Sequence, residues 1–361
     1  MRPVRLSVLM LSVVFACGTP RPETDMRLEE VALDDAGSEQ PAPVPVPAKL
    51  SETGLFTGRL RDLIPATDVH RYEVNAPLFS DYAHKQRLIR LPEGGVATYH
   101  DSDLMELPEG TTLVKTFYYP TDLRKPTGQR RILETRLLVR HQEKWEAFTY
   151  VWDEQQEEAV LELAGDQRTV EWQDLSGNTR SVNYLVPNRN QCKNCHMRSQ
   201  DMMPIGWTAR QLNRDADGEN QLVRFARLGL ISGLPAGGWP KLADYDDEGE
   251  TTERRARAWL ESNCAHCHRP DGPAKTSGLH LLADVAEPLH LGIGKAPVAA
   301  GKGSGGLRFD IVPGEPGQSI LVHRIRSSDP GVMMPELGRT LMHREGVELV
   351  EEWIRGMRKS P

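Results

Sequence analysis

The residues with the clearest chemistry form two five-residue motifs of one type, Cys192-Lys-Asn-Cys195-His196 and Cys264-Ala-His-Cys267-His268. Cys-x-x-Cys-His is the attachment sequence of a c-type haem. The two thiols can add to the two vinyl groups on one porphyrin edge, and the adjacent imidazole can then bind the iron. The sequence therefore predicts two covalently bound haem c groups, held by these four cysteines and ligated on the proximal side by His196 and His268.

Zinc and disulfides explain less of this pattern. Two cysteine pairs can hold one zinc ion, but the pairs then usually lie about 15–20 residues apart, and Cys195 and Cys264 are much farther apart than that. Neither a zinc site nor two structural disulfides requires a histidine directly after each pair. Haem attachment accounts for both histidines.

For the second haem, the sequence offers a methionine as sixth ligand. Met334 precedes a proline and lies far enough beyond His268 for the chain to pass around a porphyrin. Methionine is a common sixth ligand in cytochromes c. The neighbouring Met333 is the alternative ligand, and simple packing is the alternative role, because methionine fills gaps in cores readily.

For the first haem, the sixth ligand stays open. Met203 follows His196 so closely that the extended chain between them reaches at most about 25 Å, so a path around the haem edge is strained. A histidine from elsewhere, such as His84, His280 or His323, is equally compatible with the sequence. An open sixth position is compatible as well.

These residues need elements that position them, and the first such element is expected to be a sheet. Between residues 51 and 186, short apolar alternations are separated by turns, which predicts an antiparallel β-sandwich or barrel-like domain. Arg87–Leu91 and Val96–Tyr99 are expected to pair as a hairpin, and so are Ile132–Val139 and Trp145–Trp152. In the last run, alternate aromatic residues share one face, which could bind a sugar but is more typical of a sheet core.

The rest of the chain is expected to be mainly helical. Apolar residues at helical spacing predict helices over 254–263 and 346–357, at the two ends of residues 251–361. This arrangement, with the second motif and Met334 between the helices, resembles a class I cytochrome c. Residues 187–250 offer one convincing helix, at 221–231, so the first haem is expected to lean on a neighbouring domain. The predicted fold class is α+β and multidomain.

The start of the chain predicts export. Arg2 and Arg5 precede an apolar run that is too short to span a bilayer, so residues 1–16 are typical of a signal peptide. Ala16-Cys17 resembles a lipobox, in which Cys17 becomes the lipid-modified first residue; an ordinary cleavage site is the alternative. Residues 17–50 are polar and rich in proline, which predicts an extended tether. We therefore expect a periplasmic or envelope protein anchored to a membrane by lipid.

Composition limits the remaining functions. The net charge of −7 over 361 residues argues against a nucleic-acid partner. No later run is long and apolar enough for a spanning helix, and five cysteines are too few for a disulfide scaffold.

Several further segments make the chain similar to a family of bacterial two-haem c-type cytochromes with a β-rich amino-terminal part. They are Asn75–Tyr82, Lys115–Tyr119, Trp145–Trp152 with Ala159, Pro204–Gly206 with Arg210–Asn213, and Val332–Arg339. The resemblance implies a periplasmic or surface electron carrier without an established substrate. It implies no sixth ligand for the first haem.

The resulting expectation is an exported dihaem cytochrome that passes single electrons between redox proteins of the envelope, and that is more an electron carrier than an enzyme with its own substrate. The alternative is an enzyme of the dihaem peroxidase type, in which one haem keeps an open position for peroxide. A third possibility, compatible with electron transfer, is that the β-rich part docks a protein or a polymer; exposed aromatic residues on the sheet would favour it.

Overall fold

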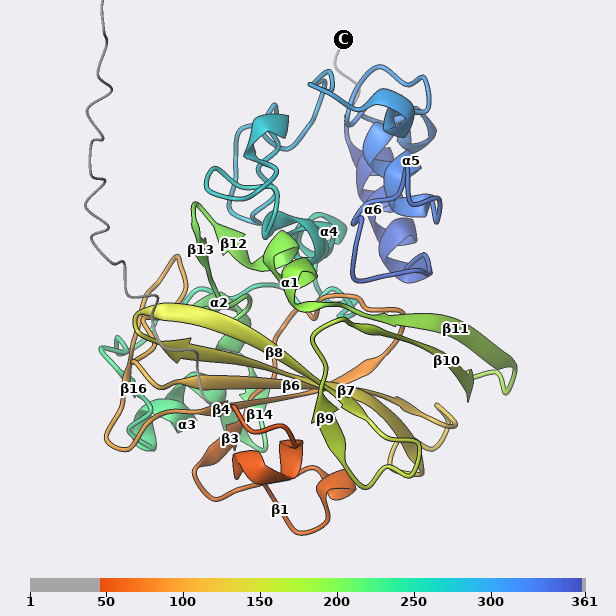
Figure 1. The fold of residues 1–361 in the computed structure, drawn as a ribbon. Helices are drawn as coiled ribbons and strands as arrows, with labels where there is room; N and C mark the ends of the chain where they lie inside the picture. The colour runs from red at the N-terminus through yellow and green to blue at the C-terminus, as the bar shows by residue number, and fades with distance from the viewer. Residues whose placement is uncertain (1–45, 359–361) are drawn as a thin grey trace, which may run out of the picture. The chain divides into compact units, whose positions relative to one another are not determined.

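The computed structural model describes residues 46–358, so the predicted signal peptide, Cys17 and most of the predicted tether lie outside the described residues. The centre of the structure is an open, six-stranded antiparallel sheet (Figure 1). Its strands, in spatial order, are β3 (Val69–Arg71), β4 (His84–Arg90), β6 (Thr112–Pro120), β7 (Arg130–His141), β8 (Lys144–Trp152) and β9 (Ala159–Leu161).

The hairpin predicted around residues 141–144 is confirmed as β7 and β8. His141 pairs with Lys144, and the two turn residues, Gln142 and Glu143, both have positive φ. The aromatic stripe on β8 is buried in the core, as the core interpretation predicts. It packs on Leu50 and its neighbours, which cover this face of the sheet from the amino-terminal side.

The other predicted hairpin is wrong. Arg87 lies in β4, which pairs over seven residues with β6. The second predicted strand is only β5 (Ala97–Thr98), which leaves the sheet and pairs in parallel with β16 (Ile231–Ser232). β6 offers nine residues for pairing, whereas β5 offers two, so the longer register is formed.

The sheet is not closed, so the barrel-like alternative is also wrong. A hairpin of β10 (Asp166–Gln173) and β11 (Thr179–Val186) lies over one end of the second face. Val170, Trp172, Val182 and Tyr184 from this hairpin pack on Phe117 of β6 and on its neighbours. The result is a mixed α/β structure dominated by open antiparallel sheets.

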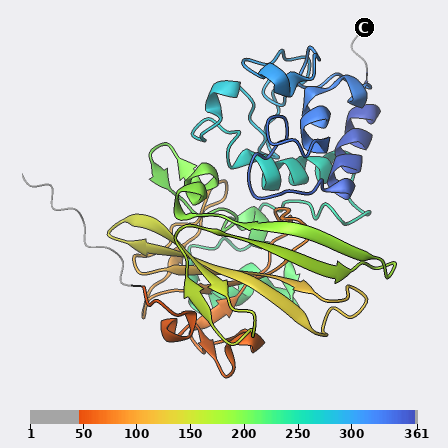
Figure 2. The same cartoon turned by 45° about the vertical axis from the view of Figure 1, so that its right-hand side comes forward.

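Helices α2 (Ala209–Leu212) and α3 (Gln221–Arg227) pack on the second face of the sheet, whereas α4 (Thr252–Leu260), α5 (Ile320–Arg326) and α6 (Arg344–Gly356) share a core of their own (Figure 2). Helices α4 and α6 pack together so closely that a Cβ on Gly346 would lie 2.2 Å from Trp259 Nε1. Helix α1 spans Arg189–His196, and a π-helical turn at Glu261–Ala265 follows α4. The predicted helices at 254–263, 346–357 and 221–231 therefore form, the last one shortened.

The remaining elements are short. The strands are β1 (Phe56–Thr57), β2 (Ile64–Pro65), β12 (Met197–Arg198), β13 (Asp201–Met202), β14 (Asp215–Ala216) and β15 (Glu219–Asn220). The 3₁₀ turns are Leu50–Thr53, Leu60–Asp62, Lys275–Ser277, Gly301–Ser304 and Pro316–Gln318. The last residues of the predicted tether already belong to the fold, because Leu161 donates to Ala48 O and Tyr150 to Pro47 O.

Candidate functional site

The first motif lies on α1. Asn188 caps this helix in a reciprocal capping box with Gln191, which fixes where the helix begins. The helix ends at His196, whose Nδ1 lies 2.8 Å from Met203 O, and Met203 N donates back to His196 O at 2.7 Å. Burial lowers the pKa of His196 to about 4, so the imidazole is neutral at pH 7.

The second motif follows α4 through the π-helical turn. Ser277 Oγ donates to Ala274 O and accepts from His268 Nδ1, at 2.7 and 3.0 Å. Burial lowers the pKa of His268 to about 4 and raises that of the Cys264 thiol to about 12. Both motif histidines therefore use Nδ1 for an internal hydrogen bond, which orients the ring and leaves Nε2 available to a metal.

The two motifs lie directly against each other. Cys267 Sγ donates to Asn194 O at 3.3 Å, and Ser199 N donates to Asp271 O at 2.7 Å. Arg198 joins Asp271 by an ion pair of 2.9 Å. The neighbouring Cys267 thiol, together with His266, lowers the pKa of the Cys195 thiol. No motif or spacing in the chain predicted this contact.

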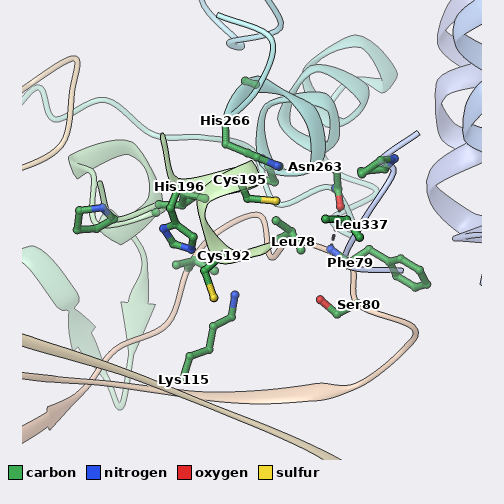
Figure 3. Close-up of a pocket in the computed structure, with 18 of the residues that line it drawn as sticks. Leu78, Phe79, Ser80, Lys115, Cys192, Cys195, His196, Asn263, His266 and Leu337 are labelled. Carbon is green, nitrogen blue, oxygen red and sulfur yellow. Dashed lines mark hydrogen bonds between the residues drawn. The ribbon is translucent and has the colours of Figure 1, made fainter. Parts of the chain in front are cut away.

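A cavity of about 520 Å³ runs beside the first motif and reaches the methionine segment, and its volume is typical of ligand pockets. Cys192, Cys195 and His196 line it from one side, and Lys115 of β6 reaches into it from the sheet (Figure 3). Met333 and Met334 line it as well. Of the second motif, Ala265 and His266 line this cavity.

The segment around Met334 is held by its main chain. Met334 N donates to Arg324 O at 3.1 Å, and Met334 O accepts from two nitrogens of Arg339 at 2.8 and 3.2 Å. The charge of Arg324 contributes to the lowered pKa of His268, after burial. Arg324 therefore contacts the methionine segment through its main chain and acts on His268 through its charge.

The candidates for the first sixth ligand lie in different places. Met203 lines the cavity, but its main chain is tied to His196 itself. His84 packs on Tyr118, and His280 on His290. None of His84, His280 and His323 is among the described residues that line the cavity.

One segment ties the sheet to both motif regions. Asn75 donates to Arg210 O and Asn213 O, and Phe79 N donates to Asn263 Oδ1 at 2.8 Å. Asp81 accepts four hydrogen bonds from Thr340 and Leu341. The resemblance picked out this segment, Asn75–Tyr82, but the residues alone gave no reason for it.

Sequence reasoning also missed three side chains that face the cavity. Lys115 shares a strand face with Leu113 and Phe117, so a charged residue at an inward position was the available signal. His266 lies inside the second motif, and its Nδ1 is buried without a partner. Arg339, inside the resemblance segment, gave no signal of its own.

The residues of the first motif, which line the cavity, fit a covalently attached haem; the second motif offers the same donor types, but Cys264, Cys267 and His268 do not line this cavity. All four motif cysteines carry free thiols, both motif histidines present Nε2, and the cavity is lined mainly by apolar surface. Within residues 46–358, no three or more His, Cys, Asp or Glu side chains gather in a group that could hold a metal ion by themselves.

Comparison of the chain with models of protein families, with curated proteins and with solved structures found no match. Over the part that the structure describes, no helix combines the length and the apolar character needed to cross a membrane.

Proposed function

We propose that this protein is a dihaem c-type cytochrome that passes single electrons between redox proteins of the bacterial envelope. Cys192 and Cys195 hold one haem, Cys264 and Cys267 the other, and the histidine after each pair is the proximal ligand. A bound haem supplies a one-electron iron couple whose potential depends on axial ligands, burial and hydrogen bonding.

The proposal rests on one observation: both motif histidines are oriented by a hydrogen bond at the same ring nitrogen, Nδ1. Each ring gives Nδ1 to an oxygen of the chain, at 2.8 Å for His196 and 3.0 Å for His268. Metal-binding histidines are almost always oriented in this way by a partner of the second ring nitrogen. The same arrangement beside two separate cysteine pairs is what two haem sites require.

The finer assignment of the carboxyl-terminal part rests on α4 and α6. In our proposal these two helices, with the second motif and Met334 between them, form a unit similar to a class I cytochrome c. The close approach at Gly346 and the Arg339 hydrogen bonds to Met334 O support it. Met334 is then the sixth ligand of the second haem, with Met333 as the alternative.

The contact between the motifs supports electron transfer within the chain. The first motif's Asn194 accepts from Cys267 of the second, and Arg198 joins Asp271. Because the motifs are in contact, haems attached to them would be neighbours, which would permit electron transfer from one to the other. We further propose export by the signal peptide 1–16, lipid attachment at Cys17, and redox proteins as partners.

A haem count combined with ligand titration tests the proposal. The full chain is produced in a host that exports and matures c-type cytochromes, and covalent haem is measured as the pyridine haemochrome. We expect two haems per chain, low-spin and slow to bind cyanide. A protein without haem, or with bound zinc instead, contradicts the proposal. One high-spin haem that reacts rapidly with peroxide favours the dihaem peroxidase alternative.

A further inference from the structure

A row of three cationic side chains crosses the sheet below the first motif. Arg87 of β4 pairs with Lys115 of β6, and Lys115 pairs with Arg136 of β7. All three line the cavity. Like charges placed directly opposite each other destabilise a sheet, so a row of this kind needs compensation.

The charges of Arg87 and Arg136 are compensated by acidic partners, whereas the charge of Lys115 is not. Arg87 forms an ion pair with Glu73 at 3.5 Å, and Arg136 Nε donates to Glu134 at 2.7 Å. Within the described residues, Lys115 Nζ makes no hydrogen bond or ion pair, and its one ring contact is with Phe117 at 5.2 Å. The amine therefore remains available for a further partner.

The surroundings of Lys115 make the neutral amine accessible near neutral pH. Burial, together with the charges of Arg87 and Arg136, lowers the pKa of Lys115 to about 7. Other charged groups that act on it include Glu134, on the same strand as Arg136, Cys195 of the first motif, and Lys85 of β4. A neutral amine has a lone pair, which makes it a nitrogen donor for a metal.

The position of Lys115 is suited to binding a metal in the cavity. Lys115 extends from β6 into the cavity, with its amine directed toward Cys192, while Cys192 and His196 come from α1 (Figure 3). Met203, by contrast, is bound through its main chain to His196. Lys115 and His196 thus approach the same cavity from different elements.

We infer that Lys115 Nζ is the sixth ligand of the haem iron at the first motif, with His196 as the fifth. The inference rests on the proposed function. In forming this bond the Lys115 ammonium releases one proton to solvent, and its lone pair then bonds to the iron without a change of oxidation state. Two other outcomes are distinguishable: Lys115 pairs as a cation with a haem propionate, or His266, with its unpartnered buried Nδ1, is the ligand.

The test uses ferric full-length protein and two substitutions, Lys115→Leu and Lys115→Arg. Arginine keeps the charge and cannot bind iron, so it separates ligation from ion pairing. We expect electron paramagnetic resonance and near-infrared magnetic circular dichroism of the wild type to show one haem with histidine–amine ligation. In both variants, half of the low-spin signal should become high-spin, and cyanide should bind that half at least tenfold faster.

Lys85→Gln is the control, because Lys85 is a partly buried lysine of β4 that contacts the same Phe117 ring as Lys115, but whose amine already donates to Leu78 O and Ala83 O. It should leave the spectrum unchanged. A wild-type spectrum of histidine–methionine or bis-histidine type at the first haem overturns the inference even if a variant fails to fold. So does a Lys115→Arg spectrum identical to the wild type, which indicates ion pairing, or a conversion produced only by His266→Leu. Absence of covalent haem at Cys192 and Cys195 overturns the proposed function as well, and the haem count recognises that case.

Discussion

The first motif lies on an eight-residue helix whose side chains are all at least partly exposed, beside a sheet with a row of cations. The second motif ends a helix whose last residues are deeply buried, between α6 and the methionine segment. One five-residue pattern therefore occurs in two environments. Attachment is a local property of the pattern, whereas the surroundings that set a haem's potential are supplied by distant parts of the chain.

The largest effect should come from the helix packing around the second motif. Gly346→Val places side-chain atoms where a Cβ alone would lie 2.2 Å from Trp259 Nε1. Overpacking of this kind costs about 2–3 kcal/mol or more of unfolding free energy. Urea denaturation should show this loss, and the second haem should lose its low-spin signal before the first.

Gly356→Ala is the matched control on the same helix, because nothing lies within 4 Å of a Cβ there. Alanine is a better helix former than glycine by up to about 1 kcal/mol, so this variant should be as stable as the wild type or more so. Equal denaturation midpoints for both variants would show that α4 and α6 are not tightly packed.

Asp81→Ala should have the next largest effect, because it removes the hydrogen bonds that join the Asn75–Tyr82 segment to the chain just after Met334. The substitution removes the acceptor for the main-chain N–H groups of Thr340 and Leu341. Leaving these two partly buried donors unpaired should cost about 1–3 kcal/mol, measured by urea denaturation. Asp217→Asn, at an exposed ion pair with Arg224, should change stability by less than about 1 kcal/mol. A similar loss of stability in both variants would show that Asp81 does not link the sheet to the methionine segment.

His343 should make stability depend on pH. Its ring stacks on Phe79 and accepts from Trp259 Nε1, and burial lowers its pKa to about 4. The unfolded chain, with a histidine pKa near 6.5, binds the proton more readily, so stability is complete above about pH 6.5 and falls by up to about 3 kcal/mol as pH decreases toward 4.

His343→Gln should flatten that part of the curve of unfolding free energy against pH, measured from pH 4 to 8. The exposed His290→Gln variant should keep the wild-type slope. If the slope survives in His343→Gln, the buried ring is not its source.

The smallest effect is expected at the contact between the motifs. Arg198→Met removes the ion pairs to Asp103 and Asp271, which should cost about 1 kcal/mol and leave both haems attached. Arg227→Met, which removes an exposed pair with Glu219, should cost less. If the Arg227 variant proves the less stable of the two, Arg198 does not hold the motifs together.

The local patterns were readable from the sequence and the long-range ones were not. The β7–β8 hairpin and helices α4 and α6 follow from alternation and helical spacing over long runs. The hairpin predicted after β4 is wrong because local alternation does not show that β4 can form more strand pairs with β6 than with the nearer β5. Lys115 and Asp81 could not be placed in this way, because their roles depend on strand register and on partners more than twenty residues away.

Potentiometric titration tests the central claim, two haem sites of different character, most directly. It compares the wild type with the variants Cys192→Ser/Cys195→Ser and Cys264→Ser/Cys267→Ser. We predict two one-electron steps at different potentials in the wild type, and one surviving step, a different one, in each variant. A single step in the wild type, or no haem signal at all, would contradict the account.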